Sequence, residues 1–491
     1  MGLENRGYHT KILASQGSTS EVKASHTIVP KFDDPNLVGC AGLVPALLLA
    51  RAAGLDELAG QHLEVDSPNP ATKTTAIVAG MVAGADGIDD MDVLRHGAMP
   101  RLFTEVVAPS TIGTYLRAFT QGQIAQLDAV ASRFLIGLIG LVGGLLAGAK
   151  GKDGEEGILF VDVDDTIRQV YGHAKQGAAY GYSKIKGLNA QLAVLSTPLA
   201  APVIAAAKLR RGNVSSASGS ARLLARALAT ARAAAVSCRV MVRADSAYFN
   251  HAFISTARRA GAWFSVTARM NPAVKAAITS IDPNAWTPIK YPKAVWDDQL
   301  EQWVSDAEVA EIDFVAFTSK KKRHHVACRL VVRRVKRHQR LASDGTEQGE
   351  LFAAYRHHGF VTNSTLEIVE ADARHRDHAI IEQVIAELKD GALAHLPSGK
   401  KTANSAWLAH AVMAFNLARA TAVLAGGTHT KSRWATVRTQ LINVPARVAT
   451  SSRRTTLHLP RDWAWAGAWE HLHTQAKALL LAARPPTAAA A

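Results

Sequence analysis

Cysteine is scarce in this chain, and the few cysteines are far apart. Three occur among 491 residues, Cys40, Cys238 and Cys328, and the sequence contains no Cys-x-x-Cys pair. Thiols spaced in this way exclude a disulfide framework and a zinc site built on cysteine ligands. The sequence therefore predicts reduced, buried thiols in a cytosolic protein.

Long hydrophobic runs are missing as well. The N-terminal residues, MGLENRGYHT, contain no apolar core of a signal peptide. The most apolar stretch, residues 134–149, spans 16 residues and includes five glycines. Because a membrane-spanning helix needs about 20 apolar residues, this stretch favours a buried core helix. We therefore expect no membrane partner.

Acidic residues are too few to balance the basic ones. The 56 lysines and arginines exceed the 41 aspartates and glutamates, which gives a net charge of +15. Such an excess favours a polyanionic partner, and we favour nucleic acid over an acidic membrane surface. A hydrophobic fraction of 48% and a charged fraction of 20% are typical of a folded protein and not of a disordered one.

The length of the sequence predicts about two to four domains, because 491 residues are too many for one hydrophobic core. We expect a flexible arm (1–30), a helical DNA-binding region (31–150), a first part of an α/β core (156–271), a β-rich insertion (272–356), a second part of the core (357–425) and a C-terminal helical region with a tail (426–491). Within the helical region, residues 108–119 fit two interpretations. They form either a DNA-reading helix, capped by Ser110 with Tyr115 and Arg117 facing outward, or an ordinary helical hairpin.

The α/β core is predicted from the order of its strands. After residue 156 the pattern reads as three strands, a helix, a strand, a helix and a strand. This order predicts a mixed α/β layer that begins with antiparallel strands, as ribonuclease-H-like folds do. The first strand, ILFVDVD, ends in aspartates, and a later strand, CRVMVRAD, ends on Asp245.

A basic segment dominates the β-rich part. Residues 320–340, KKKRHHVACRLVVRRVKRHQR, contain ten lysines and arginines and no acidic residue. A β-ribbon with alternating apolar and basic positions would lay one charged face on a phosphate backbone. The alternative is an edge strand that charge protects from aggregation. The candidates for DNA contact are Lys320, Lys321, Lys322, Arg333 and Arg334.

The stretch VDVDDT, residues 161–166, is compatible with two kinds of phosphoryl chemistry. In a haloacid-dehalogenase-like phosphatase, Asp162 would be the nucleophile and Asp164 the general acid and base. The last motif of that pattern is missing, because no second carboxylate follows Asp245 within SAYFNHAF. In the other chemistry, carboxylates from separate elements hold two Mg²⁺ or Mn²⁺ ions about 3.5–4 Å apart for in-line attack at phosphorus. Asp164 and Asp245 would supply two carboxylates, and a helix would supply the third.

Glu382 meets this last requirement. On a helical wheel His375, His378, Glu382 and Lys389 fall within about 60° of one another, since steps of three, four and seven residues return to one face. The apolar residues between them lie on a different side and can pack on the sheet. One helix face therefore offers a carboxylate beside basic and imidazole groups, although a surface helix with scattered polar residues would have the same pattern.

Together these motifs resemble the DDE-type insertion-sequence transposases, in the cut-and-paste branch with a β-rich insertion and a Tyr-Arg-Glu-Lys signature. The likeness covers roughly residues 35 to 470. In the signature the glutamate and the lysine match, whereas two histidines stand where the tyrosine and the arginine are expected. The matching positions are Asp164 and Thr166 for an Asp-x-Thr motif, Asp245 for the second aspartate, and His375, His378, Glu382 and Lys389 for the signature.

The resemblance implies a site and its cofactors. Asp164, Asp245 and Glu382 would bind two Mg²⁺ or Mn²⁺ ions, with Asp162 and Thr166 in supporting positions. The groups that would hold phosphate are His375, His378 and Lys389, helped by Arg374 or Arg376. The tryptophans that could fill the space of a flipped base are Trp286, Trp296 and Trp303.

The resemblance also implies a reaction and its partners. Such transposases bind the terminal inverted repeats of their element, usually as dimers on double-stranded DNA, in the bacterial cytoplasm on the nucleoid. Metal-activated water cuts a strand at the element end. The freed 3′-OH often forms a hairpin and later attacks target DNA. Two alternatives remain open, a phosphatase that uses Asp162 and a catalytically inactive DNA-binding relic.

Overall fold

The computed structural model describes residues 28–103, 106–149, 157–172, 174–234, 238–291, 306–336, 355–452 and 454–483, together with the backbone of the short strands β9 (Val295–Asp297) and β10 (Gln302–Val304). The chain divides into two compact units, residues 1–35 and 36–491, and every element below belongs to the second unit. The expected arm, apart from residues 28–30, and the alanine-rich end of the chain lie outside the described residues.

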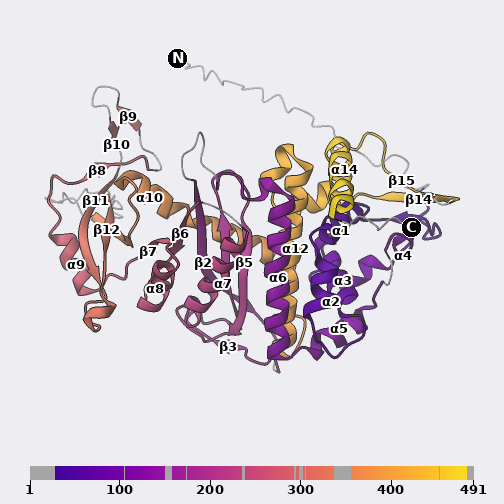
Figure 1. Ribbon diagram of the computed structural model, residues 1–491, viewed down its shortest axis with the longest axis horizontal. Helices are drawn as coiled ribbons and strands as arrows, with labels where there is room; N and C mark the ends of the chain where they lie inside the picture. Colours follow the sequence, from indigo (N-terminus) through magenta and orange to yellow (C-terminus); the bar gives the residue numbers. More distant parts are fainter. Residues whose placement is uncertain are drawn as a thin grey trace, which may run out of the picture. The chain divides into compact units, whose positions relative to one another are not determined.

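A mixed β-sheet forms the centre of the second unit (Figure 1). Its strands here are β2 (Ile158–Gln169), β3 (Ala179–Tyr180), β4 (Lys186–Ser196), β5 (Val203–Arg211), β6 (Arg239–Ala244) and β7 (Trp263–Thr267). The strand order is β5-β4-β2-β6-β7, with β3 pairing on the same edge of β4 as β5 does. β2 runs antiparallel to β4 and parallel to β6, and β7 is parallel to β6. The predicted order of strands and helices is confirmed.

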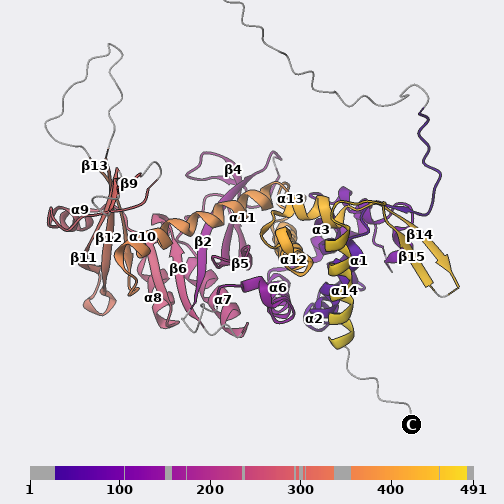
Figure 2. The same ribbon diagram turned by 90° about the horizontal axis from the view of Figure 1, so that it is seen from above.

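Helices cover both faces of this sheet (Figure 2). Helices α7 (Ser220–Ala233) and α8 (His251–Arg259) pack on one face, and α10 (Ile368–Arg376) and α11 (Ile380–Lys389) lie along the other, joined by the short turn η6 (Asp377–Ala379). Side chains of a strand alternate between the two faces. In β2, Val161 and Val163 therefore join the apolar core, while Asp162 and Asp164 face the side of α10 and α11.

The β-rich block extends the same sheet. The strands are β8 (Thr287–Pro288), β11 (Ala307–Ala316), β12 (Val326–Lys336) and β13 (Tyr355–Thr362). β13 pairs with β7, and β12, β11 and β8 follow in order. The block opens with helix α9 (Pro272–Thr279), whose first turn is capped by the Asn271 side chain. The predicted strands are present, but they continue the central sheet because β13 bonds directly to the open edge of β7.

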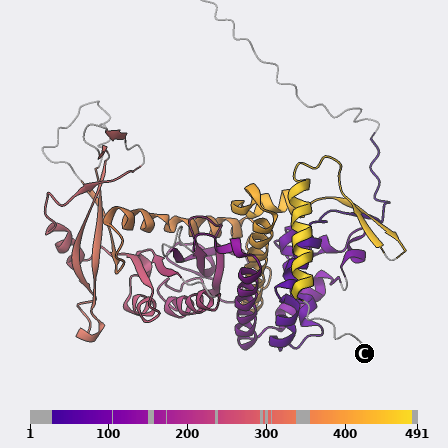
Figure 3. The same cartoon turned by 45° about the horizontal axis from the view of Figure 1, so that its top comes forward.

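The helical region of residues 31–150 is present as expected. Its helices are α1 (Leu43–Ala52), α2 (Leu55–His62), α3 (Pro70–Ala83), α4 (Met99–Leu102), α5 (Pro109–Ala118) and α6 (Gln121–Leu141), with short turns η2 (Asp89–Leu94) and η3 (Gly143–Leu146). A capping box of Thr120 and Gln123 starts α6. Two helices of the described chain, α6 and α12 (Lys401–Ala425), are long and apolar enough to cross a membrane by length and composition. Helix α12 is mostly buried between α6, α3 and β5, as a core helix is (Figure 3).

Three expectations about the helical parts are corrected. Tyr115 of α5 faces inward, because its hydroxyl is buried against the Thr74 hydroxyl at 2.9 Å, while Arg117 is exposed. Ser110 is not the cap of α5, which starts with Pro109 after Ala108. The C-terminal region is not wholly helical. It contains η7 (Gly427–Lys431), α13 (Trp434–Val437), the π-helical turn η8 (Arg438–Ile442), the strands β14 (Ala446–Ser451) and β15 (Arg454–His458), which pair with β1 (Leu37–Val38), and α14 (Ala466–Ala483).

Candidate active site

Asp164 and Asp245 come together where the parallel pairing of two neighbouring strands ends. Asp164 lies within β2, which continues to Gln169 and so does not end in the aspartates as expected, and Asp245 comes directly after β6. The pairing of β2 with β6 aligns Val163 with Ala244, so the next residue of each strand is an aspartate. Residues side by side in a parallel pair point to the same face of the sheet. Asp164 is half-buried and Asp245 is exposed. The structure thus brings together the two aspartates that the sequence singled out.

Both carboxyl groups carry a charge that their surroundings compensate poorly. Burial, with the nearby charges of Asp245 and Asp165, raises the pKa of Asp164 to about 6. Partial burial also raises the pKa of Asp245, although backbone amides of the following turn η4 (Ser246–Tyr248) oppose this shift. The Asp245 carboxylate accepts a hydrogen bond from the Ala247 amide at 2.9 Å. Two close carboxylates with raised pKa values favour the binding of a cation.

Asp162, two residues before Asp164, has a structural role. It is fully buried and accepts hydrogen bonds from the Arg243 guanidinium at 2.7 and 2.8 Å and from the Ser196 hydroxyl at 2.8 Å. The His378 Nδ1 atom lies 2.9 Å from the same carboxylate. Burial alone would raise the pKa of Asp162, but Arg243 and His378 lower it to about 2. A carboxylate enclosed in this way does not fit the attacking group of a phosphatase, which must reach its substrate.

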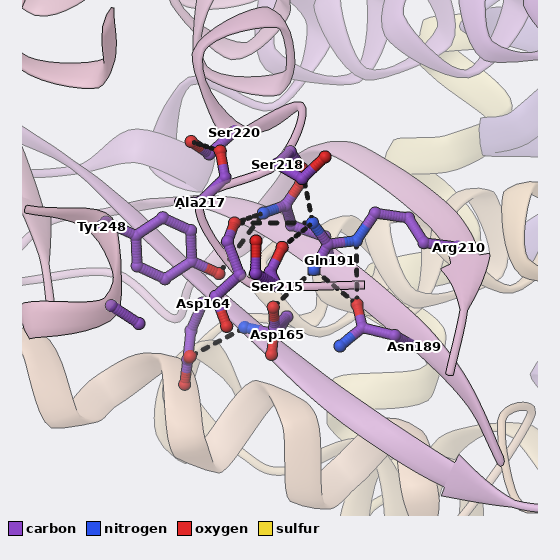
Figure 4. A network of polar contacts seen from close by, with 12 residues as sticks. Asp164, Asp165, Asn189, Gln191, Arg210, Ser215, Ala217, Ser218, Ser220 and Tyr248 are labelled. Carbon is purple, nitrogen blue, oxygen red and sulfur yellow. Dashed lines mark hydrogen bonds and ion pairs between the residues drawn. The ribbon is translucent and has the colours of Figure 1, made fainter. Parts of the chain in front are cut away.

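Asp165 belongs to a second network on the opposite face of β2. Figure 4 shows the Asp164 carboxylate turned away from Arg210, which forms an ion pair with Asp165 at 2.5 Å. The Arg210 guanidinium also donates to Asn189 Oδ1 at 2.6 and 2.9 Å and to backbone carbonyls of the loop before α7. Tyr248 is buried nearby, and burial together with the charge of Asp165 raises the pKa of its phenol. This network fixes the strand that carries Asp164.

The structure places the predicted third carboxylate, Glu382, in the first turn of α11, the helix that packs on β2. Its side chain is exposed. Among the described residues no set of three or more potential ligands converges into a metal site. Lys389, at the end of α11, is half-buried, and its pKa is lowered by burial and by Arg168, with Asp164 acting in the opposite direction. Lys389 is thus within electrostatic reach of Asp164.

The two histidines of the signature have partners of their own. Both ring nitrogens of His375 are occupied, by the hydroxyls of Ser265 at 2.8 Å and Thr267 at 3.0 Å, and its ring stacks on Phe360. Burial and the neighbouring His378 hold the pKa of His375 well below its usual value, so the ring is neutral. The prediction that His375 holds a phosphate therefore does not agree with its contacts. His378 contacts Asp162, as described above.

The predicted basic residues fall into two groups. Arg333 and Arg376 both form ion pairs with buried Asp372, at 2.6 and 2.9 Å. Arg334 is paired with Glu308 and lies over the Trp286 ring, 4.1 Å from its centroid. The exposed group lies in the turn between β11 and β12, which includes η5 (Lys322–His324), and consists of Lys320, Lys321 and Lys322. The side chains of Trp296 and Trp303 lie outside the described residues.

Sequence reasoning missed Arg168. It is four residues after Asp164 in β2, and therefore on the same face as Asp164 and the largely buried Thr166. Its Nε atom is buried and has no hydrogen-bond partner in the described part of the chain. Together with Arg117 and Lys175 it lines a groove of about 1060 Å³ beyond the end of β2. Strand periodicity alone could have identified this arginine as a neighbour of the site.

Comparison with known families is consistent with this geometry. A family model described as transposase DDE domain group 1 matches residues 23–480, nearly the whole chain. No curated protein matches the chain. A match of this extent shows a transposase, an enzyme that acts on DNA, in a family that generally uses divalent metal ions. The chain belongs to the transposases of DDE domain group 1.

Proposed function

We propose that this transposase binds the terminal inverted repeats of its element and cuts and joins DNA strands at a two-metal site made by Asp164, Asp245 and Glu382. The observation that carries the proposal is that Asp164 and Asp245 each directly follow the last pair, Val163 with Ala244, of the adjacent parallel strands β2 and β6. Burial and the neighbouring carboxylate of Asp165 raise both pKa values, so an added positive charge would stabilise the ionised carboxylates. Arg243, the nearest candidate for that charge in β6, is already paired with Asp162.

The fold proposed for the catalytic core is ribonuclease-H-like, formed by residues 156–271 and 357–425, with residues 272–356 as a β-rich insertion. Three antiparallel strands followed by two strands parallel to the first support it. After β7 the chain forms the β-rich block, and it returns through β13, which pairs with β7, to α10 and α11. Helix α11 then packs on β2, where the third carboxylate is needed.

The residues present fit Mg²⁺ or Mn²⁺. The donor atoms are carboxylate oxygens, which these hard cations prefer. Asp164, Asp245 and Glu382 would hold the ions. Two such ions, when bound, activate the attacking oxygen and stabilise the leaving oxygen of a phosphodiester. Glu382 is exposed in the first turn of α11, the helix that packs on β2, so its carboxylate is free of the apolar packing of that helix.

Two basic groups beside the carboxylates are suited to hold the scissile phosphate. Lys389 occupies the lysine position of the proposed signature and is electrostatically coupled to Asp164. Arg168 contributes a guanidinium from the same face of β2. Because the nitrogens of His375 already have partners, we assign the phosphate contacts to Lys389 and Arg168. His378 positions Asp162 instead.

A cleavage assay tests the proposal. The purified full chain is mixed with duplex DNA carrying the element's own ends, with Mg²⁺ or with a chelator. We compare wild type with Asp245→Asn, Glu382→Gln and, as a matched control, Glu370→Gln, an exposed glutamate of α10 that pairs with Arg374. We expect metal-dependent nicking at the element boundary by wild type and the control, and its loss in the other two variants. Thermal unfolding checks that all four proteins are folded.

Full cleavage by Glu382→Gln would refute its assignment as a ligand. Salt-sensitive binding of the element ends without cutting in either metal condition would identify an inactive relic. A hairpin product at the element end would support the cut-and-paste branch with the Tyr-Arg-Glu-Lys signature. We further propose action as a homodimer on DNA in the bacterial cytoplasm, which sedimentation of the protein with its DNA ends would test.

A further inference from the structure

The hairpin of β14 and β15 is an exposed two-stranded ribbon attached to the helical part of the chain. Its base pairs with β1, where Val38 aligns with Ala446. Ser451 and Arg454 are the last pair of the two strands, and Ser452, directly after β14, adopts a φ of 52°. Figure 2 shows the hairpin reaching past α1 and α14. Neither the catalytic aspartates nor the basic turn of residues 320–325 belongs to this part of the fold.

The two faces of the ribbon differ in chemistry. On one face Val448 is buried opposite Leu457, and the ribbon packs on its own part of the core through them. On the other face the paired positions are Arg447 with His458, Ala449 with Thr456, and Ser451 with Arg454. Both arginines, His458 and Ser451 are exposed. This outer face contains no large apolar side chain and no acid.

The charged side chains within the ribbon segment have one sign. Residues 444–461 contain four arginines, one histidine and no aspartate or glutamate. Arg101, at the end of α4, donates to Thr450 Oγ1 at 2.8 Å on the face of the ribbon that carries Val448. An exposed face with two guanidinium groups and an imidazole and no carboxylate among its six paired residues attracts a polyanion.

We propose that the outer face of the β14–β15 ribbon is a DNA-binding surface of the transposase, distinct from its catalytic site, that contacts double-stranded DNA. A two-stranded antiparallel ribbon fits the major groove of B-DNA. Arginine, serine and threonine side chains are common partners of the DNA backbone. A surface that bound a second copy of the chain would need exposed apolar or aromatic side chains at its centre, which the outer face lacks. The proposal rests on the proposed function, since the DNA it contacts is the DNA that the enzyme processes.

Binding measured against salt concentration tests the proposal. The full chain and the double variant Arg447→Ser with Arg454→Ser are titrated with two duplexes, one carrying the element end and one of unrelated sequence. Each phosphate contact contributes about 0.9 to the slope of log affinity against log salt. We expect the double variant to lose about two units of slope and on the order of tenfold in affinity for both duplexes.

A second double variant, which loses two arginines on another part of the surface, is the matched control. Arg222 and Arg232 are exposed on α7, on the face of the sheet opposite α11, and Arg222→Ser with Arg232→Ser should keep the wild-type slope. Amide hydrogen exchange provides a measurement that needs no variant. Added DNA should slow exchange of residues 446–458 in the wild-type chain.

An unchanged slope in the ribbon variant, with unprotected ribbon amides, would overturn the proposal. The proposal would also be overturned if the ribbon variant kept the wild-type salt slope for DNA binding but changed its oligomeric state in the absence of DNA. That result would identify the face as an interface between copies of the chain. A wild-type chain that binds DNA but does not cut it would refute the proposed catalytic function alone. In that case the salt slopes of the wild type and of the ribbon variant would still decide whether the ribbon contacts DNA.

Discussion

Replacing Asp162 with asparagine should strongly destabilise the central sheet. The carboxylate is fully buried and is the counter-charge of Arg243, whose side chain is 1% exposed. Asparagine keeps the shape but removes the charge, which leaves a guanidinium in the core without a compensating anion. Losing one partner of a buried ion pair costs about 3–5 kcal/mol. That cost is a large part of the 5–15 kcal/mol, roughly, by which folded proteins are stable.

Urea unfolding at pH 7 measures the effect as a free energy of unfolding. The set comprises wild type, Asp162→Asn, Arg243→Met, the double variant and a control, Asp377→Asn, an exposed aspartate of η6. The control should change stability by about 0.5 kcal/mol or less. The double variant should lose less than the sum of the single losses, because it leaves no unpaired charge in the core.

The pH dependence gives a second test of the same ion pair. The folded pKa of Asp162 is about 2, below its ordinary value. Its contribution to stability is therefore complete above the ordinary carboxyl range and is lost as the pH falls towards 2. Asp162→Asn should lack this acid-dependent loss. A destabilisation below about 1 kcal/mol, or additive effects in the double variant, would refute our account of the buried pair.

Three further predictions concern the metal site and the packing. Mg²⁺ binding, measured by calorimetry, should weaken as the pH falls through about 6, because the Asp164 carboxylate must lose its proton and its pKa is about 6; equal affinity at pH 5 and pH 7.5 would contradict this. Glu387→Ala should lower the free energy of unfolding in urea by about 3–5 kcal/mol, since it leaves buried Arg419 without the carboxylate that lies 2.7 Å away. Retention of wild-type stability would mean that water solvates the Arg419 guanidinium in the variant. Gly42→Ala should lower the melting temperature, because its Cβ would lie 1.7 Å from the Leu441 carbonyl oxygen; an unchanged melting temperature would show that the turn there moves easily.

Much of the fold could be predicted from local pattern. The apolar runs of β2 and β6 and the amphipathic face of α11 are visible in sequence periodicity, and the structure confirms them. The hairpin of β14 and β15 was missed. It is short, polar and half exposed, and its strands are stabilised by pairing with Leu37 and Val38, some 400 residues earlier, which no local window contains.

The candidate site was also predicted only in part, because local pattern identifies some of its residues and long-range packing decides the others. Aspartates that follow two apolar strand segments identify Asp164 and Asp245 as neighbours, provided that the strands are adjacent and parallel. The register of β2 and β6 satisfies this condition, and β2 itself continues past Asp164 to Gln169. The arginines of the basic segment could not be sorted by pattern. Arg333 and Arg334 differ from the exposed lysines only because α10 and β11 place acidic side chains against them.

The sequence by itself determined the excess of positive charge, the order of the strands and helices and the carboxylates that are candidates for binding a metal ion, since these depend on composition and on the local spacing of side chains. Only the tertiary structure decided which aspartate does what. Asp162, Asp164 and Asp165 are consecutive or nearly so, but the alternation of β2 directs them to different surroundings. Arg243 and His378 enclose the first, Arg210 holds the third, and the second alone lies open beside Asp245. Those partners come from strands and helices far away in the chain, and only packing brings their charges within reach.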